Sequence, residues 1–421
     1  MKAALIALAL LLVALAASPA RAQGPVVNES SAQGVFPDGI TFTLDAESSA
    51  GFDEIRLVYQ IAPDGVRATT DPDCTGGTAV RCTYDLAAGN RTPLIPGAEV
   101  TYFWRVTIGG ERTDTAAQVV VYEDTRFDWQ QISDGNVTLW WYEGSEEDAR
   151  AVLAAGREAL ERISALLQTS VDFPVKIRYY GSAQEMQAAI ISDNQEGVIT
   201  LGEVVYSDTA MVSADSAPLD IARHEIAHIV IREALRGPFN VPDWLNEGTA
   251  VYAQTEPLSS QRQALDAAIE TGQVFSVRSI SSASAGALGS RVALFYAQSW
   301  SLVDFLIATY GEEDFAALFQ AFDEGASIDG ALEQVYGFNQ DGLENAWREH
   351  VGLPPREAPT PDGDALQEPP TEADPTPDVS SDEADGGSGS STVVVIAIVA
   401  LMVVLAAGLV VRGVTIVRRR R

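Results

Sequence analysis

The feature that most constrains this chain is the pentapeptide HEIAH at 224–228, which uses two of only three histidines in 421 residues. On a helix, His224 and His228 lie on one face about one turn apart, so both imidazoles can reach a single metal ion. Glu225 then projects beside them, where it can hold and deprotonate a metal-bound water. The pattern predicts a metal-binding helix over 218–235, and Gly-Pro at 237–238 ends it.

A second motif supplies another ligand. Glu247 lies in the stretch WLNEGTAVY (244–252), with eighteen residues between it and His228. A catalytic zinc ion takes three protein ligands and keeps a fourth position for water, and two histidines with one glutamate are a known set. Asp243 is suited to cap the N-terminus of the helix that carries Glu247. The two motifs therefore predict a zinc site built from two helices.

HEIAH and WLNEGTAVY together resemble the gluzincin zinc metallopeptidases, the group that includes thermolysin and aminopeptidase N. This resemblance implies one Zn²⁺ ion and a zinc-activated water that hydrolyses a peptide bond. It implies that the zinc ligands are His224, His228 and Glu247. It also implies that Glu225 is the general base.

The likeness is densest over 216–256, and residues 124–352 are similar to the peptidase-MA-like domains of bacterial surface proteins. In gluzincins a Tyr or His from later in the domain helps to stabilise the tetrahedral intermediate. Tyr296 is our first candidate for that catalytic role. Tyr252, one helical turn past Glu247, is the second candidate, and His350 is the third.

Two departures from the family pattern bear on the activity. Thermolysin-like enzymes carry an Asp four residues after the glutamate ligand to support a histidine, and Val251 stands there in this chain. Aminopeptidase-N-like enzymes carry a G-x-M-E-N stretch that grips the free amine of the substrate, and this sequence lacks that stretch. The first departure means that the support of the histidine must come from another residue. The second favours an endopeptidase over an aminopeptidase, and we expect a peptide or protein substrate.

Two alternatives stay open at this point. One is a non-catalytic surface module for binding or adhesion on a peptidase-like scaffold. The other is a zinc hydrolase that acts on a non-peptide substrate of the cell envelope. Retention of all four chemical groups favours the peptidase, because degenerate relatives usually lose the base or a ligand.

Both ends of the chain indicate export and anchoring. Residues 1–22 read as a signal peptide, with an apolar run that ends in an A-x-A cleavage site. Residues 392–411 form an uncharged stretch long enough to cross a membrane as a helix. The basic tail at 412–421 stays cytoplasmic by the positive-inside rule, so the pattern predicts a single-pass cell-membrane protein with its N-terminal domains outside.

Charge and cysteine content fit an exported protein. The whole chain has a net charge of −32, and the segment between the signal peptide and position 412 has a net charge of −39. Such a surface repels nucleic acid. Cys74 and Cys82 are the two cysteines, and outside the cell they are expected to form a disulfide that pins a hairpin.

The predicted fold class is α+β. Residues 23–123 alternate apolar and polar residues between turns, which is typical of an all-β sandwich of the fibronectin-III or immunoglobulin kind. Residues 124–352 pass from strands to helices, as expected for a gluzincin-type domain with a small sheet and a helical C-terminal subdomain. Residues 353–391, rich in proline and acidic residues, should form a disordered stalk. The strand at 209–213 is expected to pair with an extended substrate at the edge of the sheet.

Overall fold

The computed structural model describes residues 25–63, 65–89, 94–190, 202–236, 241–282 and 291–356. They form two compact units that meet between Glu123 and Asp124, and each unit is described by itself. The predicted signal peptide, most of the stalk, the transmembrane helix and the basic tail lie outside the described residues.

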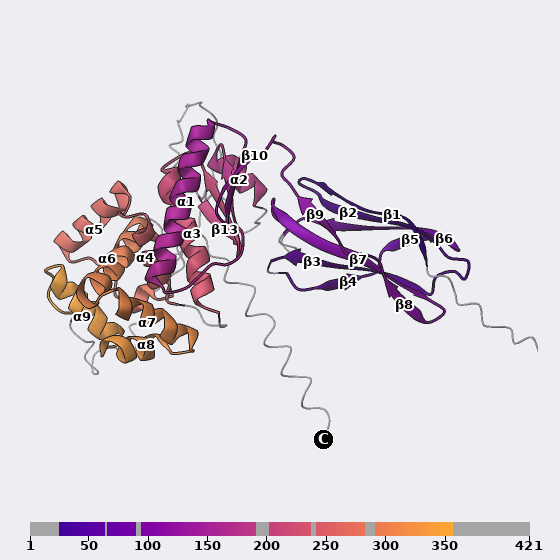
Figure 1. Ribbon diagram of the computed structural model, residues 1–421. Coiled ribbons are helices and arrows are strands. Elements are labelled where there is room, and N and C mark those ends of the chain that lie inside the picture. Colours follow the sequence, from indigo (N-terminus) through magenta and orange to yellow (C-terminus); the bar gives the residue numbers. More distant parts are fainter. Residues whose placement is uncertain are drawn as a thin grey trace, which may run out of the picture. The chain divides into compact units, whose positions relative to one another are not determined.

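The first unit consists of two antiparallel sheets (Figure 1). One sheet has the strand order β1-β2-β6-β5, and the other has the order β4-β3-β7-β8 with β9 also paired to β7. The strands are β1 (Val26–Val35), β2 (Gly39–Glu47), β3 (Glu54–Ala62), β4 (Ala68–Thr70), β5 (Asp73–Gly76), β6 (Ala79–Ala87), β7 (Ala98–Ile108), β8 (Glu111–Asp114) and β9 (Gln118–Tyr122).

Alternating apolar residues hold the two sheets of the first unit together. Phe42 on β2 and Tyr102 on β7 meet across the interior with ring centroids 4.9 Å apart. Because successive side chains of a strand point to opposite faces, this alternation buries one face of each sheet. Cys74 and Cys82 lie directly opposite each other on β5 and β6 and form the predicted disulfide. The all-β prediction is confirmed, and the closer likeness to a fibronectin-III or immunoglobulin domain stays a prediction.

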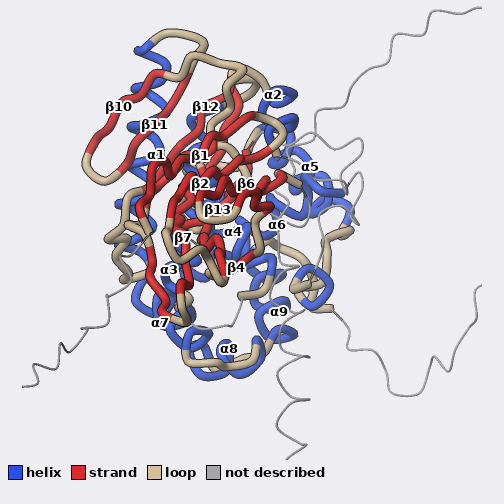
Figure 2. Tube along the Cα trace, turned by 90° about the vertical axis from the view of Figure 1, so that its right-hand side faces the viewer, coloured by secondary structure: helices blue, strands red, loops and turns tan. Residues whose placement is uncertain are grey.

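The second unit is built on one mixed sheet with the strand order β10-β11-β12-β14-β13. The inner strands β11, β12 and β14 are parallel, and the outer strands β10 and β13 pair antiparallel. Figures 1 and 2 show α1 beside this sheet, with α7 and α8 gathered away from β10. The strands are β10 (Gln130–Asp134), β11 (Val137–Trp141), β12 (Val175–Tyr180), β13 (Gly202–Tyr206) and β14 (Thr209–Ser213).

Helices make up the rest of the second unit, so the α+β prediction is confirmed. A capping box of Ser145 and Asp148 starts α1, which packs against α3, and α4 packs against α3 and α6. The helices are α1 (Glu146–Leu166), α2 (Ala183–Ala189), α3 (Pro218–Ala234), α4 (Asp243–Ala253), α5 (Ser259–Thr271), η1 (Arg278–Ile280), α6 (Val292–Tyr310), α7 (Glu312–Asp323), α8 (Ile328–Tyr336) and α9 (Gln340–His350).

One sequence expectation about the sheet is wrong. The strand Thr209–Ser213, expected at the edge, is β14, and it is hydrogen-bonded on both sides, to β12 and to β13. Val212 at its centre is fully buried. A strand with both neighbours in place has no free backbone groups for a substrate. Within the described residues, the edge of the sheet on this side is β13.

One described helix, α6, is long and apolar enough to cross a membrane by length and composition. About three fifths of its most apolar window (61%) is buried inside the second unit. Burial of this kind is typical of a core helix, so α6 is weak evidence for a membrane span.

Candidate metal centre

Two packed helices carry the predicted ligands. His224 and His228 lie on α3, which starts with Pro218 at its first position, and Glu247 lies on α4. Apolar residues surround the two histidines along α3, because this helix is buried between the sheet, α1 and α4. All three side chains are buried, with exposures of 3%, 5% and 5%. Burial of this many polar groups requires that they be paired or bind a metal.

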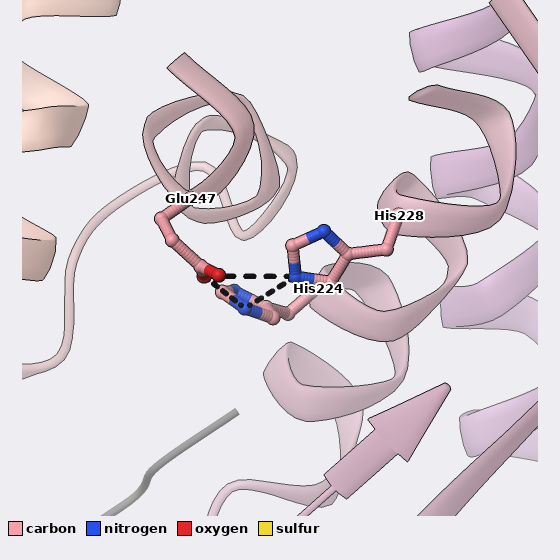
Figure 3. A group of neighbouring side chains, drawn as sticks. All are labelled: His224, His228 and Glu247. Carbon is pink, nitrogen blue, oxygen red and sulfur yellow. Dashed lines mark hydrogen bonds and ion pairs between the residues drawn. The ribbon is translucent and has the colours of Figure 1, made fainter. Parts of the chain in front are cut away.

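The three ligand atoms form a small triangle (Figure 3). The Nε2 atoms of His224 and His228 are 3.2 Å apart. Oε2 of Glu247 lies 3.4 Å from Nε2 of His224 and 3.6 Å from Nε2 of His228. Bonds of about 2.0–2.1 Å to a tetrahedral zinc ion place neighbouring ligand atoms about 3.3–3.4 Å apart. The donor set and its spacing therefore fit a zinc ion.

The charges of the three side chains are coupled. Burial acts to raise the pKa of Glu247, but the two imidazoles outweigh it and lower that pKa to about 2. Burial lowers the pKa of His224. Burial also acts to lower the pKa of His228, but the carboxylate of Glu247 outweighs it and raises that pKa. The centre thus holds one permanent anion, which favours a cation in the triangle.

Each imidazole has a carboxamide on its other nitrogen. Nδ1 of His228 lies 3.1 Å from Oδ1 of Asn246, and Nδ1 of His224 lies 3.2 Å from Nε2 of Gln254. Contacts of this kind fix the orientation of metal-binding imidazoles. The family motifs do not indicate which residues provide this support. Asn246 stands next to Glu247 inside the motif, so its position was a usable signal, whereas Gln254 lies beyond the motif.

Glu225 lies next to the triangle. It is fully buried, and within the described residues neither of its carboxylate oxygens has a hydrogen-bond partner. Burial raises its pKa to about 8, the carboxylates of Glu247 and Glu203 add to this, and His228 opposes it. A buried carboxylate that is short of partners is suited to accept a proton from a group that enters the site.

Strand β13 borders Glu225 closely. A Cβ atom added at Gly202 would lie 2.7 Å from Oε1 of Glu225 and 2.4 Å from Cγ2 of Ile221, so only glycine fits at this position. The next residue, Glu203, is 5% exposed, and its Oε2 atom has no hydrogen-bond partner in the part of the chain that the structure describes. Sequence reasoning missed Glu203, because a glutamate in a strand gives no signal of its own.

The three candidates for stabilising the tetrahedral intermediate lie in different places. Tyr296 on α6 is buried, and its ring centroid is 6.0 Å from that of His224. Tyr252 instead lies under the guanidinium of Arg162, 4.9 Å from ring centroid to Cζ. His350 packs on Phe305 at the end of α9. Tyr296 is thus the candidate next to the triangle, and its catalytic role stays a prediction.

Comparisons with known proteins address the family. Residues 155–352 match the family model of the Peptidase MA superfamily. No curated protein matches the chain significantly.

Solved structures give only distant likenesses. A mutant of the M1 zinc metallopeptidase from Deinococcus radiodurans is 13% identical over 76% of this chain and 92% of its own, with a TM-score of 0.36. An aminopeptidase N family protein from Idiomarina loihiensis is 10% identical over 73% of each chain, with a TM-score of 0.35. A carbohydrate-binding module of family 56, a β-1,3-glucan binding domain, is 22% identical over 22% of this chain and 95% of its own, with a TM-score of 0.16. TM-scores this low do not establish a shared fold.

The family match is therefore the comparison that bears on the site. It covers α3, α4 and part of α1, which packs on α3. This match to the Peptidase MA superfamily supports a gluzincin-like peptidase domain in the second unit.

Proposed function

We propose that the second unit is a zinc-dependent metallopeptidase that hydrolyses peptide bonds. The observation that carries this proposal is the buried triangle of His224, His228 and Glu247, with the carboxylate of Glu225 beside it. When bound, zinc acidifies a water molecule and polarises the scissile carbonyl. Residues 155–352 match a peptidase superfamily, which supports this reaction over other zinc-dependent hydrolyses.

Different residues of the chain would have different roles in this reaction. The two imidazoles and the Glu247 carboxylate hold the ion, and the apolar surroundings of α3 exclude bulk water. Glu225 takes the proton of the attacking water and passes it to the leaving amine. Its two unpaired carboxylate oxygens leave it free for both transfers. Tyr296, next to His224, is our candidate for donating a hydrogen bond to the developing oxyanion.

We place the substrate along β13. In the described part of the sheet this strand is the last one, and its Gly202 contacts Glu225. An extended peptide that adds to the edge of β13 would run past the metal centre. This assignment replaces the edge role expected for Thr209–Ser213.

We propose an endopeptidase, because the sequence lacks the G-x-M-E-N stretch with which aminopeptidase-N-like enzymes grip the free amine of the substrate. Glu203 favours a second candidate, an aminopeptidase, since a buried carboxylate without a full set of partners can bind the free amine of a substrate. Peptides with free and acetylated N-termini separate the two. Equal cleavage of both supports the endopeptidase, and cleavage of the free form alone supports the aminopeptidase.

We also propose that the active domain works outside the cell, on a chain anchored by residues 392–411. The signal-like residues 1–22 and the basic tail at 412–421 support this topology. Protease treatment of intact cells tests it: an external domain is digested, whereas an internal one is protected.

The decisive test is zinc content and peptide cleavage by the full-length protein. Glu225→Gln should retain one zinc per chain and lose about 10²–10⁴-fold in kcat/KM. His228→Ala should lose zinc as well. Glu233→Gln, on the same helix and outside the triangle, is the matched control and should behave as the parent.

Each outcome separates the alternatives. Zinc in the parent with no cleavage of any peptide would favour a binding module or a hydrolase of non-peptide envelope substrates. A parent that binds no zinc would refute the metal centre. Cleavage by Glu225→Gln at the rate of the parent would refute the role of the base.

A further inference from the structure

A residue outside the ligand motifs contacts Nδ1 of His224, the imidazole nitrogen that is not in the triangle. We propose that Gln254 is a positioning residue of the metal centre, whose Oε1 atom accepts a hydrogen bond from Nδ1–H of His224 and so directs Nε2 toward zinc. This inference rests on the proposed function. It identifies the support that Val251, in the place of an aspartate, cannot provide.

The position of Gln254 on α4 explains why its side chain contacts His224. It is the C-cap of α4, seven residues after Glu247, so the two side chains lie on the same side of α4 about two turns apart. Asn246 at the start of α4 contacts His228, and Gln254 at the end contacts His224. One helix thus supplies a ligand and both supports.

The hydrogen-bond chemistry fixes which amide atom faces the ring. As it stands, the Nε2 group of Gln254 donates to Nδ1 of His224 over 3.2 Å, while its Oε1 atom is buried with no hydrogen-bond partner among the described residues. Metal binding through Nε2 of the imidazole requires a proton on Nδ1. A half-turn of the amide then places Oε1 on that proton and gives the orphaned oxygen a partner. Gln254 is 5% exposed, so water does not compete for this bond.

The neutral amides set the charge around the ion. With Asn246 and Gln254 as acceptors, both rings are oriented without any added negative charge, and Glu247 remains the anion among the ligands. A carboxylate in the place of either amide would strengthen the pull on the Nδ1 proton and make the imidazole a better donor. The centre is therefore expected to bind zinc less tightly than the same centre with an acidic support.

Zinc affinity of the full-length protein tests this role without any activity assay. Zn²⁺ is titrated against a chromophoric chelator for the parent, Gln254→Met and Gln254→Glu. Methionine keeps the length of the side chain and removes the hydrogen bond, so we expect affinity to fall about 10–100-fold. Glutamate keeps the acceptor and adds charge, so we expect affinity equal to or higher than that of the parent.

Gln261→Met is the matched control. Gln261 is also buried and also loses one hydrogen bond, to the backbone of Leu258, but it does not contact the triangle. This variant should bind zinc as the parent does. The Co²⁺-substituted proteins give a second readout, because ligand-field bands should move for Gln254→Met and not for the control.

The outcomes separate this inference from the proposed function. If the parent binds no zinc, the metal centre itself is refuted. If the parent binds zinc and Gln254→Met binds it equally well, the positioning role alone is refuted. Should Gln254→Met fail to fold, Gln254→Glu decides: weaker binding than the parent overturns the proposal, and equal or tighter binding supports it.

Discussion

Glu203 gives the sharpest prediction about stability, because its charge is buried without compensation. Burial raises its pKa to about 7, from an ordinary value of 4.5. The folded state therefore holds this proton more tightly than the unfolded state. The resulting stability is present below pH 4.5 and is lost as the pH rises through 7. The loss is about 3 kcal/mol at pH 8 and under about 1 kcal/mol at pH 5.

Replacing Glu203 by Gln removes the charge and keeps the shape. The variant should be more stable than the parent by about 3 kcal/mol at pH 8 and nearly equal to it at pH 5. For a unit of this size, that difference corresponds to about 6–12 °C in the midpoint of thermal unfolding. The carboxylate of Glu203 also raises the pKa of Glu225 by repulsion. Removing that repulsion should further stabilise the folded variant.

Calorimetry of the full-length protein in EDTA measures this difference. The transition of the second unit is identified as the one that added zinc moves to higher temperature. Glu333→Gln, at an exposed position on α8, controls for the loss of one negative charge. A Glu203→Gln variant with the same gain at pH 5 as at pH 8 would show that ionisation is not the cause. A variant less stable than the parent at pH 8 would refute the reasoning.

Two further predictions concern close packing and the disulfide. Gly202→Ala should displace Glu225 and destabilise the second unit by about 1–3 kcal/mol, with lower kcat/KM but retained zinc, and unchanged kinetics would contradict the contact. Replacing both Cys74 and Cys82 by serine should destabilise the first unit by about 2–3 kcal/mol through the entropy of its short closed loop. Zinc content should not change, and a loss of zinc in that variant would show that the units are coupled.

The metal triangle could be predicted from the sequence because local geometry fixes most of it. The i, i+4 spacing on one helix brings His224 and His228 together whatever the rest of the fold does. Glu247 needed in addition the packing of α4 on α3, which the WLNEGTAVY motif indicated through its resemblance to known enzymes.

The supports of the triangle could not be predicted in this way. Gln254 reaches His224 only because α4 ends where α3 passes, and no spacing within one segment encodes that meeting. The role of Glu203 could not be predicted either. Its importance comes from its burial and from Glu225 nearby, and both depend on tertiary structure. Contacts between segments that are far apart in the sequence leave no periodic signal.

The sequence itself indicates why Thr209–Ser213 is not an edge strand. The run TAMVS at 209–213 does not alternate between apolar and polar residues, and all five residues are buried. Strands covered on both faces read as continuous apolar runs, whereas an edge strand next to solvent keeps polar positions. The neighbouring run GEVVY at 202–206 interrupts its apolar residues with a glutamate, although Glu203 is itself buried. A substrate that pairs with β13, as we propose, would lie beside Gly202 and the Glu225 carboxylate that it contacts, so the choice of strand also decides which carboxylate is near the substrate.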